Sequence, residues 1–241
     1  MYRRDEEIQW KRKTYWNLVK KYATRKSLPQ VQQVEQQILL DLPRTTPRTQ
    51  TAVHSFYKSA QWNQLAKNVL LIWSQQHPSV GFFQGSTDIL LVIVDAFLTS
   101  ELPSYATDTM AEDRFQNFEA DCYWIFLAFM KNLESCLGFS NRGVEDAAKL
   151  TNSTTISTSI SSKDNRLNKK VDYCEYVFRN GMDCISDIFQ RVDPQLADHF
   201  KKQDVQMSYF ALRWVLCAMS RELDLPIIQV PKKIFFLVSL P

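Results

Sequence analysis

The chain has 241 residues, 45% of them hydrophobic and 23% charged, and 29 basic against 26 acidic residues give a formal net charge of +3. This length can bury one sizeable hydrophobic core, and a charge balance this even argues against a nucleic-acid-binding protein. The apolar run over residues 89–94 ends at Asp95 and, like every other apolar run in the sequence, is far shorter than the roughly 20 residues of a membrane-spanning helix, so we expect no transmembrane segment.

The N-terminal part of the chain shows apolar residues at every third or fourth position, with few glycines, and this predicts helices. Pro43 is expected to end the second helix, with a loop over 45–49, because proline disfavours helical geometry in the residue before it. Residues 86–99 are nearly all apolar, which favours a helix buried on most sides but leaves a strand as an alternative. The helices predicted in this part cover residues 5–23, 30–40, 61–76 and 86–99. The second has Val31, Val34, Ile38 and Leu39 on one side, and the third is expected to bury a stripe of Leu65, Val69, Ile72 and Trp73.

The C-terminal part continues the helical pattern after a polar connection at 100–113. Residues 151–165 are rich in serine and threonine and poor in core-forming residues, so we expect a flexible insert there. In the last predicted helix, Val205 and Trp214 are expected to face inward. The helices predicted in this part cover residues 115–137, 168–192 and 203–223, which makes the whole chain a single all-α domain.

Motifs for independent catalysis are absent from the sequence. The five cysteines have no C-x-x-C spacing and the three histidines have no metal-ligand spacing, which predicts neither a disulfide framework nor a metal site and favours a reducing compartment. Gly81 and Gly85 bracket a glutamine, with no Lys-Ser/Thr after them, so they do not form a phosphate-binding loop. We therefore expect no cofactor and no self-contained hydrolase or oxidoreductase.

Two short motifs carry groups suited to phosphoryl transfer. The first places Arg44 just after Pro43, and the second places Gln84 directly before a glycine. An arginine is always charged and its fork-shaped guanidinium binds phosphate oxygens, while a glutamine both donates and accepts hydrogen bonds and can hold a water. These are the two groups that a slow GTPase lacks or can have replaced.

The two motifs resemble those of the TBC-domain family of Rab GTPase-activating proteins, which read I-x-x-D-x-x-R and Y-x-Q-G. The first matches fully, ending in Asp41 and Arg44. The second matches except that Phe82 replaces the tyrosine, which keeps the ring and loses a hydroxyl. Asp88 also matches the acidic or amide position that commonly follows Gln84 in the family.

Two further blocks carry the same resemblance. Residues 119–124 are similar to the family's E-A-D-x-F-W helix, and residues 210–223 are similar to its F-A-x-R-W…R-E block. The chain is expected to begin after the family's opening R-x-x-x-W element, and the family's later R-x-W-D helix is replaced by residues 227–231. The resemblance therefore implies one partial TBC domain over residues 1–241, clipped at both ends, and it points to the Golgi-associated branch of the family.

The resemblance implies a dual-finger mechanism acting on a partner. Arg44 and Gln84 would enter the nucleotide site of a Rab-family small GTPase in its GTP state and speed hydrolysis, which regulates vesicle trafficking. GTP and magnesium would belong to the partner, so the chain would complete another protein's active site and hold no cofactor or metal of its own. The implied location is cytoplasmic, with peripheral association at Golgi or endosomal membranes. The residues implied to support the two fingers are Asp41, Phe82, Gly85 and Asp88.

Two alternatives remain open at this point. The lost tyrosine and the missing C-terminal helices favour a non-catalytic module that binds a Rab or another helical protein. A truncated gene product that folds poorly is the other alternative. Arg213 and Glu222 are expected to pair with charged groups inside the helical scaffold.

Overall fold

The computed structural model describes residues 2–45, 55–78, 80–101, 110–136 and 173–224, and every regular element in these ranges is helical. The all-α prediction is therefore confirmed, and residues 86–99 form a helix instead of a strand. The predicted insert at 151–165 lies outside the described residues. The helices are α1 (Tyr2–Ala23), α2 (Pro29–Asp41), α3 (Ala60–Gln76), α4 (Ser86–Glu101), α5 (Glu112–Cys136), α7 (Tyr173–Val192), α8 (Pro194–Lys202) and α9 (Ser208–Leu216), with short 3-10 turns η1 (Leu42–Arg44) and η2 (Phe56–Lys58).

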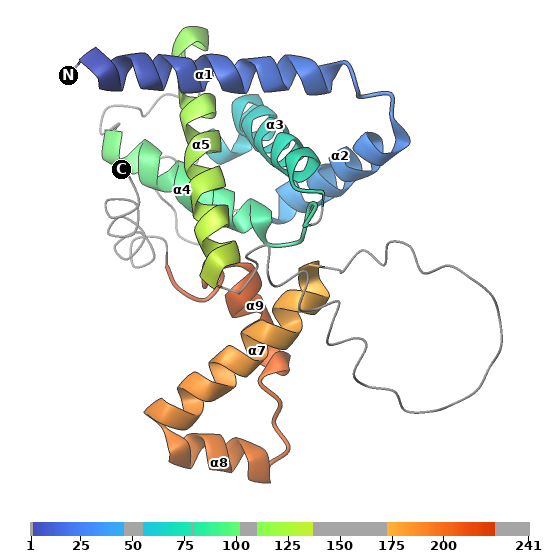
Figure 1. The fold of residues 1–241 in the computed structure, drawn as a ribbon, viewed down its shortest axis with the longest axis vertical. Coiled ribbons are helices and arrows are strands. Elements are labelled where there is room, and N and C mark those ends of the chain that lie inside the picture. The colour runs from blue at the N-terminus through green and yellow to red at the C-terminus, as the bar shows by residue number, and fades with distance from the viewer. Residues whose placement is uncertain (1, 46–54, 79, 102–109, 137–172, 225–241) are drawn as a thin grey trace, which may run out of the picture.

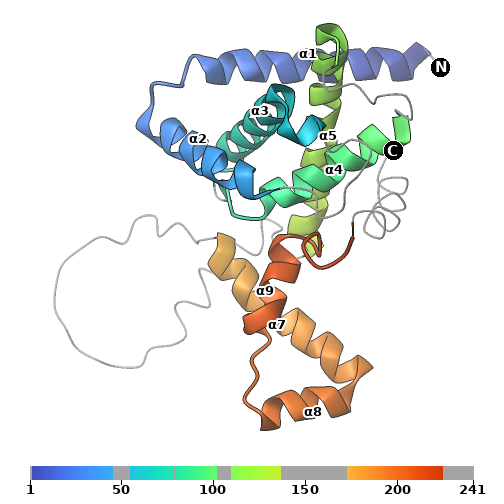
Figure 2. The same ribbon diagram turned by 180° about the vertical axis from the view of Figure 1, so that it is seen from behind.

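The helices form an N-terminal bundle and a C-terminal arm. In the bundle, α1 lies across α5, α2 packs on α3, and α4 contacts both α3 and α5 (Figure 1). The C-terminal arm, which consists of α7, α8 and α9, extends below the bundle in both views, and α7 packs against both of its partners (Figures 1 and 2). Helix α9 leads back from the arm toward the bundle, which brings the end of the described chain near α4 (Figure 2).

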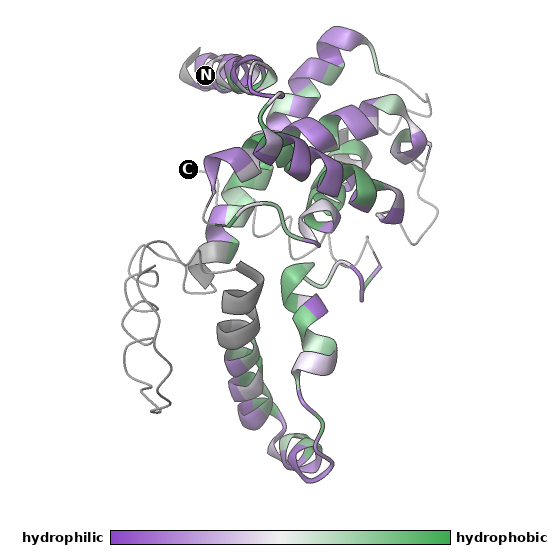
Figure 3. Ribbon diagram, turned by 90° about the vertical axis from the view of Figure 1, so that its right-hand side faces the viewer, coloured by the Kyte–Doolittle hydropathy of each residue, from purple (hydrophilic) through white to green (hydrophobic). Residues whose placement is uncertain are grey.

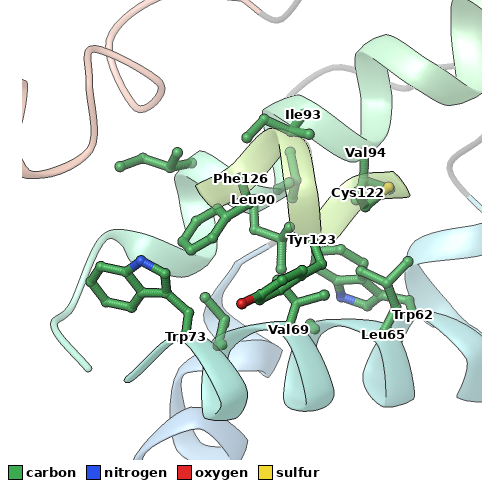
Figure 4. Close-up of a cluster of buried hydrophobic side chains, with 14 of the residues drawn as sticks. Trp62, Leu65, Val69, Trp73, Leu90, Ile93, Val94, Cys122, Tyr123 and Phe126 are labelled. Carbon is green, nitrogen blue, oxygen red and sulfur yellow. The ribbon is translucent and has the colours of Figure 1, made fainter. Parts of the chain in front are cut away.

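The hydrophobic core lies where α3, α4 and α5 meet. The predicted inward stripe of α3 is confirmed, because Leu65, Val69, Ile72 and Trp73 are all buried. Figure 4 shows Leu65, Val69 and Trp73 of this stripe facing side chains of α4 and α5, among them Phe126. Hydrophobic residues are concentrated where the bundle helices face one another, whereas the outer helices carry many hydrophilic residues (Figure 3).

Polar contacts attach α1 to α5. The Arg12 guanidinium donates to both carboxylate oxygens of Asp121 at 2.9 and 2.6 Å, and the Trp124 indole donates to the Lys11 carbonyl at 2.9 Å. These partners lie about a hundred residues apart in the sequence, so they define how the N-terminal helix sits on the bundle. Residues 119–124 therefore contribute contacts that hold α1 on α5.

The prediction of one helix over 203–223 is wrong. Helix α8 occupies 194–202, a turn follows, and α9 covers 208–216. Asp204 adopts a left-handed conformation (φ 53°) and the Val205 amide donates to the Phe200 carbonyl at 2.9 Å, which is the hydrogen bond of a Schellman cap. The cap was hidden because it uses aspartate where glycine is usual. The N-cap of α8 had a visible signal in Asp193 followed by Pro194, and the Asp193 carboxylate accepts from the Leu196 amide at 2.9 Å.

Two apolar residues predicted to face inward are exposed. Leu39 was placed on the inner side of the second helix, but its exposed fraction is 48%, while Val31 and Ile38 of the same helix are buried as expected. Val205 lies in the turn between α8 and α9 and has an exposed fraction of 37%. Periodicity identified the helical face of α2 correctly but did not define its edges.

A buried acidic residue joins α1, α3 and α5. Glu119 Oε1 accepts from the Tyr15 hydroxyl at 2.6 Å and from the Asn68 amide at 2.9 Å, while Oε2 has no hydrogen-bond partner. Burial raises the pKa of Glu119 above its usual 4.5, against the opposing effect of these two hydrogen bonds. The folded state therefore holds this proton to higher pH than the unfolded state does.

This network gives a pH-dependent stability that can be measured. Because the folded pKa of Glu119 is raised, its contribution to stability is fully present below about pH 4.5 and is lost as the pH rises through the folded value. We expect Glu119→Gln to remove this loss. Urea unfolding of both proteins at about pH 4.5 and pH 7.5 should show the wild type losing stability relative to the variant at the higher pH. A stability difference that is equal at both pH values would contradict the assignment.

Candidate functional site

Arg44 projects from a short, well-anchored turn. Helix α2 ends at Asp41, before Pro43 as predicted, and the chain continues as the 3-10 turn η1 through Arg44, because proline is tolerated in the first turn of a helix. The neighbours Leu42 and Thr45 are buried, the Thr45 amide donates to the Leu42 carbonyl at 3.1 Å, and the Thr45 hydroxyl donates to the Asp41 carbonyl at 3.1 Å. The Arg44 side chain is exposed, so a flexible cation extends from a fixed backbone.

Gln84 occupies a comparable position in residues 81–86, which we call the Gln84 turn. It is exposed, while Phe83 before it and Gly85 after it are buried. Gly85 has φ 111°, which favours glycine, and the Ser86 amide and hydroxyl both donate to the Phe83 carbonyl, at 3.2 and 2.7 Å. The carboxamide is thus held outward at the entrance to α4.

Aromatic packing fixes the Gln84 turn to the core. The Phe83 ring meets Trp73 edge-on, with 6.1 Å between ring centroids, and Trp73 in turn packs edge-on against Phe126 of α5 at 5.7 Å. Phe82 is half-buried and packs against the same core. The position where the family has a tyrosine is therefore a packing position in this chain, and the loss of the hydroxyl leaves the ring in place.

A charged cluster connects the end of α2 with the start of α4. Asp41 is buried, and burial raises the pKa of its carboxyl; the neighbouring Thr87 and the charges of Arg221 and Arg44 oppose this rise, while Asp88 adds to it. Among the described residues, Asp41 Oδ2 and Thr87 Oγ1 have no hydrogen-bond partner. Asp41 therefore lies within electrostatic range of Arg44 in the first motif and of Asp88, which follows the second motif.

Asp88 is held by residues far away in the sequence. The Arg221 guanidinium donates from Nε to Asp88 Oδ1 at 2.9 Å, and the Cys217 thiol contacts Oδ2 at 3.8 Å. Burial, and next the charge of Asp88, raise the pKa of the Cys217 thiol to about 12, so it stays protonated and can donate. Sequence reasoning assigned no role to either residue, although Arg221 lies inside the R-E block.

The structure brings the predicted site residues to one edge of the bundle. Figures 1 and 2 both show the end of α2 and the loop between α3 and α4 at the edge that faces the C-terminal arm. Arg44 and Gln84 are exposed at this edge, Phe82 is half-buried, and the other three are buried: Asp41, Gly85 and Asp88.

The described residues form neither a metal-binding cluster nor a membrane-spanning helix. No cluster of three or more histidine, cysteine, aspartate or glutamate side chains in the described ranges could hold a metal ion. Within those ranges, no helix combines the length and the apolar character needed to span a bilayer.

Comparison with known proteins identifies similar sequences. The profile of the family described as "Rab-GTPase-TBC domain" matches residues 3–179 and 166–230. Human "TBC1 domain family member 22B" is 21% identical over 227 residues, which is 92% of this chain and 37% of the relative. "GTPase-activating protein GYP1" of Saccharomyces cerevisiae is 27% identical over 235 residues, which is 92% of this chain and 30% of the relative. The chain thus spans less than two thirds of the length of these relatives.

A solved structure shows the same fold. The crystal structure of the Ypt/Rab-GAP domain of Gyp1p superposes with a TM-score of 0.68 at 21% sequence identity, covering 95% of this chain and 62% of that one. At this identity the likeness establishes the helical architecture and leaves the roles of individual side chains to be tested.

Proposed function

Because the chain belongs to the Rab-GTPase-TBC domain family, we propose that it is a GTPase-activating protein that speeds GTP hydrolysis by a Rab-family small GTPase. Arg44 enters the nucleotide site of the partner and neutralises charge that develops on the transferred phosphoryl group. Gln84 positions the attacking water. The partner supplies GTP and magnesium, and the chain acts in the cytoplasm at the surface of Golgi or endosomal membranes to regulate vesicle trafficking.

One observation carries this proposal: Arg44 and Gln84 are both exposed at one edge of the bundle, and each has buried residues within two positions on either side. An arginine supplied in trans increases GTP hydrolysis by about 10³–10⁵. At ~1.4 kcal/mol per tenfold change, this is roughly 4–7 kcal/mol of transition-state stabilisation. Anchored backbones at both positions favour such a gain, because catalysis of this kind depends on groups that are already in place.

The supporting residues have separate tasks in the proposed mechanism. Asp41 attracts the Arg44 guanidinium, and Asp88, bound by Arg221, anchors the start of α4. Gly85 allows the turn that exposes Gln84, and Phe82 packs the turn against the core. None of these four needs to touch the nucleotide.

The second candidate function is a module that binds a Rab without activating it. Phe82 in place of tyrosine is the observation in its favour, because a hydroxyl is missing beside Gln84. Such a module would bind the GTP state and leave its lifetime unchanged.

A panel of GTP-loaded Rab proteins separates the two candidates. Phosphate release is measured with the wild-type chain and with an Arg44→Ala/Gln84→Ala double variant, and binding is measured in parallel. The catalytic proposal expects at least one Rab whose hydrolysis the wild type stimulates and the double variant does not, with binding retained. Binding without stimulation by either protein would favour the non-catalytic module.

A further inference from the structure

The chain after α9 reaches back to the Gln84 turn. We call residues 216–221 the post-α9 segment. A Cβ atom on Gly85 would lie 2.8 Å from the Leu216 carbonyl oxygen and 3.1 Å from Cys217 Sγ, so the backbones of the two segments are in direct contact. Three residues after Gly85, in the first turn of α4, Asp88 makes a further contact with this segment: Arg221 Nε donates to Asp88 Oδ1 at 2.9 Å.

The Arg221–Asp88 ion pair is well shielded and joins distant parts of the chain. The side chains of Arg221 and Asp88 have exposed fractions of 28% and 10%, and the two residues are 133 positions apart. Asp88 lies in the first turn of α4, where a negative charge is also favoured by the helix dipole. A pair that is screened this little by solvent constrains its partners more than a surface pair does.

Two strained backbone positions in the post-α9 segment direct the side chains of Cys217 and Arg221 toward α4. Ala218 and Met219 both adopt left-handed conformations, with φ 47° and 64°, which side-chain-bearing residues rarely do in succession. The Met219 amide donates to the Trp214 carbonyl at 2.8 Å, so the chain reverses directly after α9. This reversal turns Cys217 and Arg221 toward α4.

A second ion pair supports the reversal from the outer side. Arg213 donates from Nε to Glu222 Oε1 at 2.6 Å, which confirms that these two residues pair within the scaffold. It joins the last turn of α9 to the residue that follows Arg221. The reversal is therefore held at both ends, and it presents Arg221 in one orientation.

We propose that Arg221 is a positioning residue for Gln84: through Asp88 and the backbone contact at Gly85, it holds the Gln84 turn in the orientation that presents the carboxamide to the partner. This inference rests on the proposed function for its catalytic consequence. Loss of Arg221 leaves the Asp88 carboxylate without its cation and next to the Asp41 carboxylate. The two like charges then repel each other at the junction of α2 and α4, which shifts the base of the Gln84 turn.

The expected catalytic effect is on the rate of the stimulated step. A displacement near 1 Å at a catalytic group costs about 10²-fold in rate. We expect Arg221→Ala to lower the kcat of the GTP hydrolysis that the chain stimulates in a Rab by about this factor, with little change in KM. In a chain that already carries Gln84→Ala, Arg221→Ala should add little, because both changes remove the same contribution. Asp88→Asn should partly restore the rate of Arg221→Ala by removing the unpaired carboxylate.

Arg12→Ala is the matched control, because it removes another half-buried ion pair, Arg12–Asp121, at the α1–α5 contact. Hydrogen exchange of the Ser86 and Ile89 amides, which donate to the Phe83 and Gly85 carbonyls, gives a readout independent of activity. Exchange at these amides should accelerate in Arg221→Ala and stay unchanged in Arg12→Ala.

The outcomes decide the proposal in each case. A loss of kcat and faster exchange in Arg221→Ala alone support it. Equal effects of the Arg221 and Arg12 variants, or no effect of Arg221→Ala on exchange, overturn it. If the wild-type chain stimulates no Rab, the proposed function fails, and the exchange experiment alone then decides whether Arg221 holds the Gln84 turn.

Discussion

Replacing Arg44 with alanine is expected to reduce stimulated GTP hydrolysis by about 10³–10⁵, which removes most of the activation. The side chain supplies charge that its neighbours do not replace, because Asp41 is a carboxylate and the guanidinium of Arg221 is bound to Asp88. Binding should persist, since the rest of the surface is unchanged. Single-turnover phosphate release from a responsive Rab, with affinity measured separately, tests this expectation.

Two further variants sharpen the test of Arg44. Arg44→Lys keeps the charge and loses the planar fork, so it should recover only a small part of the rate. Arg191→Ala removes an exposed arginine from the last turn of α7 and should leave the rate unchanged. If Arg44→Ala retained full stimulation, the cation would have no catalytic role, and the non-catalytic module would be the better description.

Gly85→Ala is expected to disable the Gln84 turn. A Cβ atom there would lie 2.8 Å from the Leu216 carbonyl oxygen, and a backbone atom cannot move aside as a flexible side chain can. The φ of 111° adds strain for any residue other than glycine, of order 1–3 kcal/mol. We therefore expect the turn and the post-α9 segment to separate, with a fall in stimulated hydrolysis of about 10² or more and a lower midpoint of thermal unfolding.

Gly81→Ala provides the comparison within the same turn. Gly81 also has a left-handed φ, 69°, but a Cβ atom added there would meet nothing within 4 Å. Its cost should be limited to the backbone strain of roughly 1–2 kcal/mol, with hydrolysis largely retained. Thermal unfolding and phosphate release, measured for both variants, distinguish the effect of backbone strain, which both share, from the effect of the steric contact with Leu216, which only Gly85→Ala introduces. Equal losses of activity in the two variants would show that the contact with Leu216 has no special importance.

The sequence identified most of the bundle because its helices carry their signals locally. The stripe of α3, at Leu65, Val69 and Trp73, repeats with the period of a helix and is buried as expected. The same reasoning failed between residues 193 and 223, where the ends of helices are marked by Asp193 and by the left-handed Asp204. Those signals depend on single residues with unusual backbone geometry, which a repeating pattern does not report.

The candidate site likewise has one part that the sequence predicts and another that only the folded structure determines. The order and chemical type of Arg44 and Gln84 are present in the amino-acid sequence, because a motif needs only neighbouring residues. That both side chains are exposed at one edge, and that Arg221 binds Asp88 across 133 positions, was decided by how the helices pack. An ion pair of this kind has no local signature, since its partners meet only after the chain between them has folded and the reversal at Ala218 has turned one toward the other.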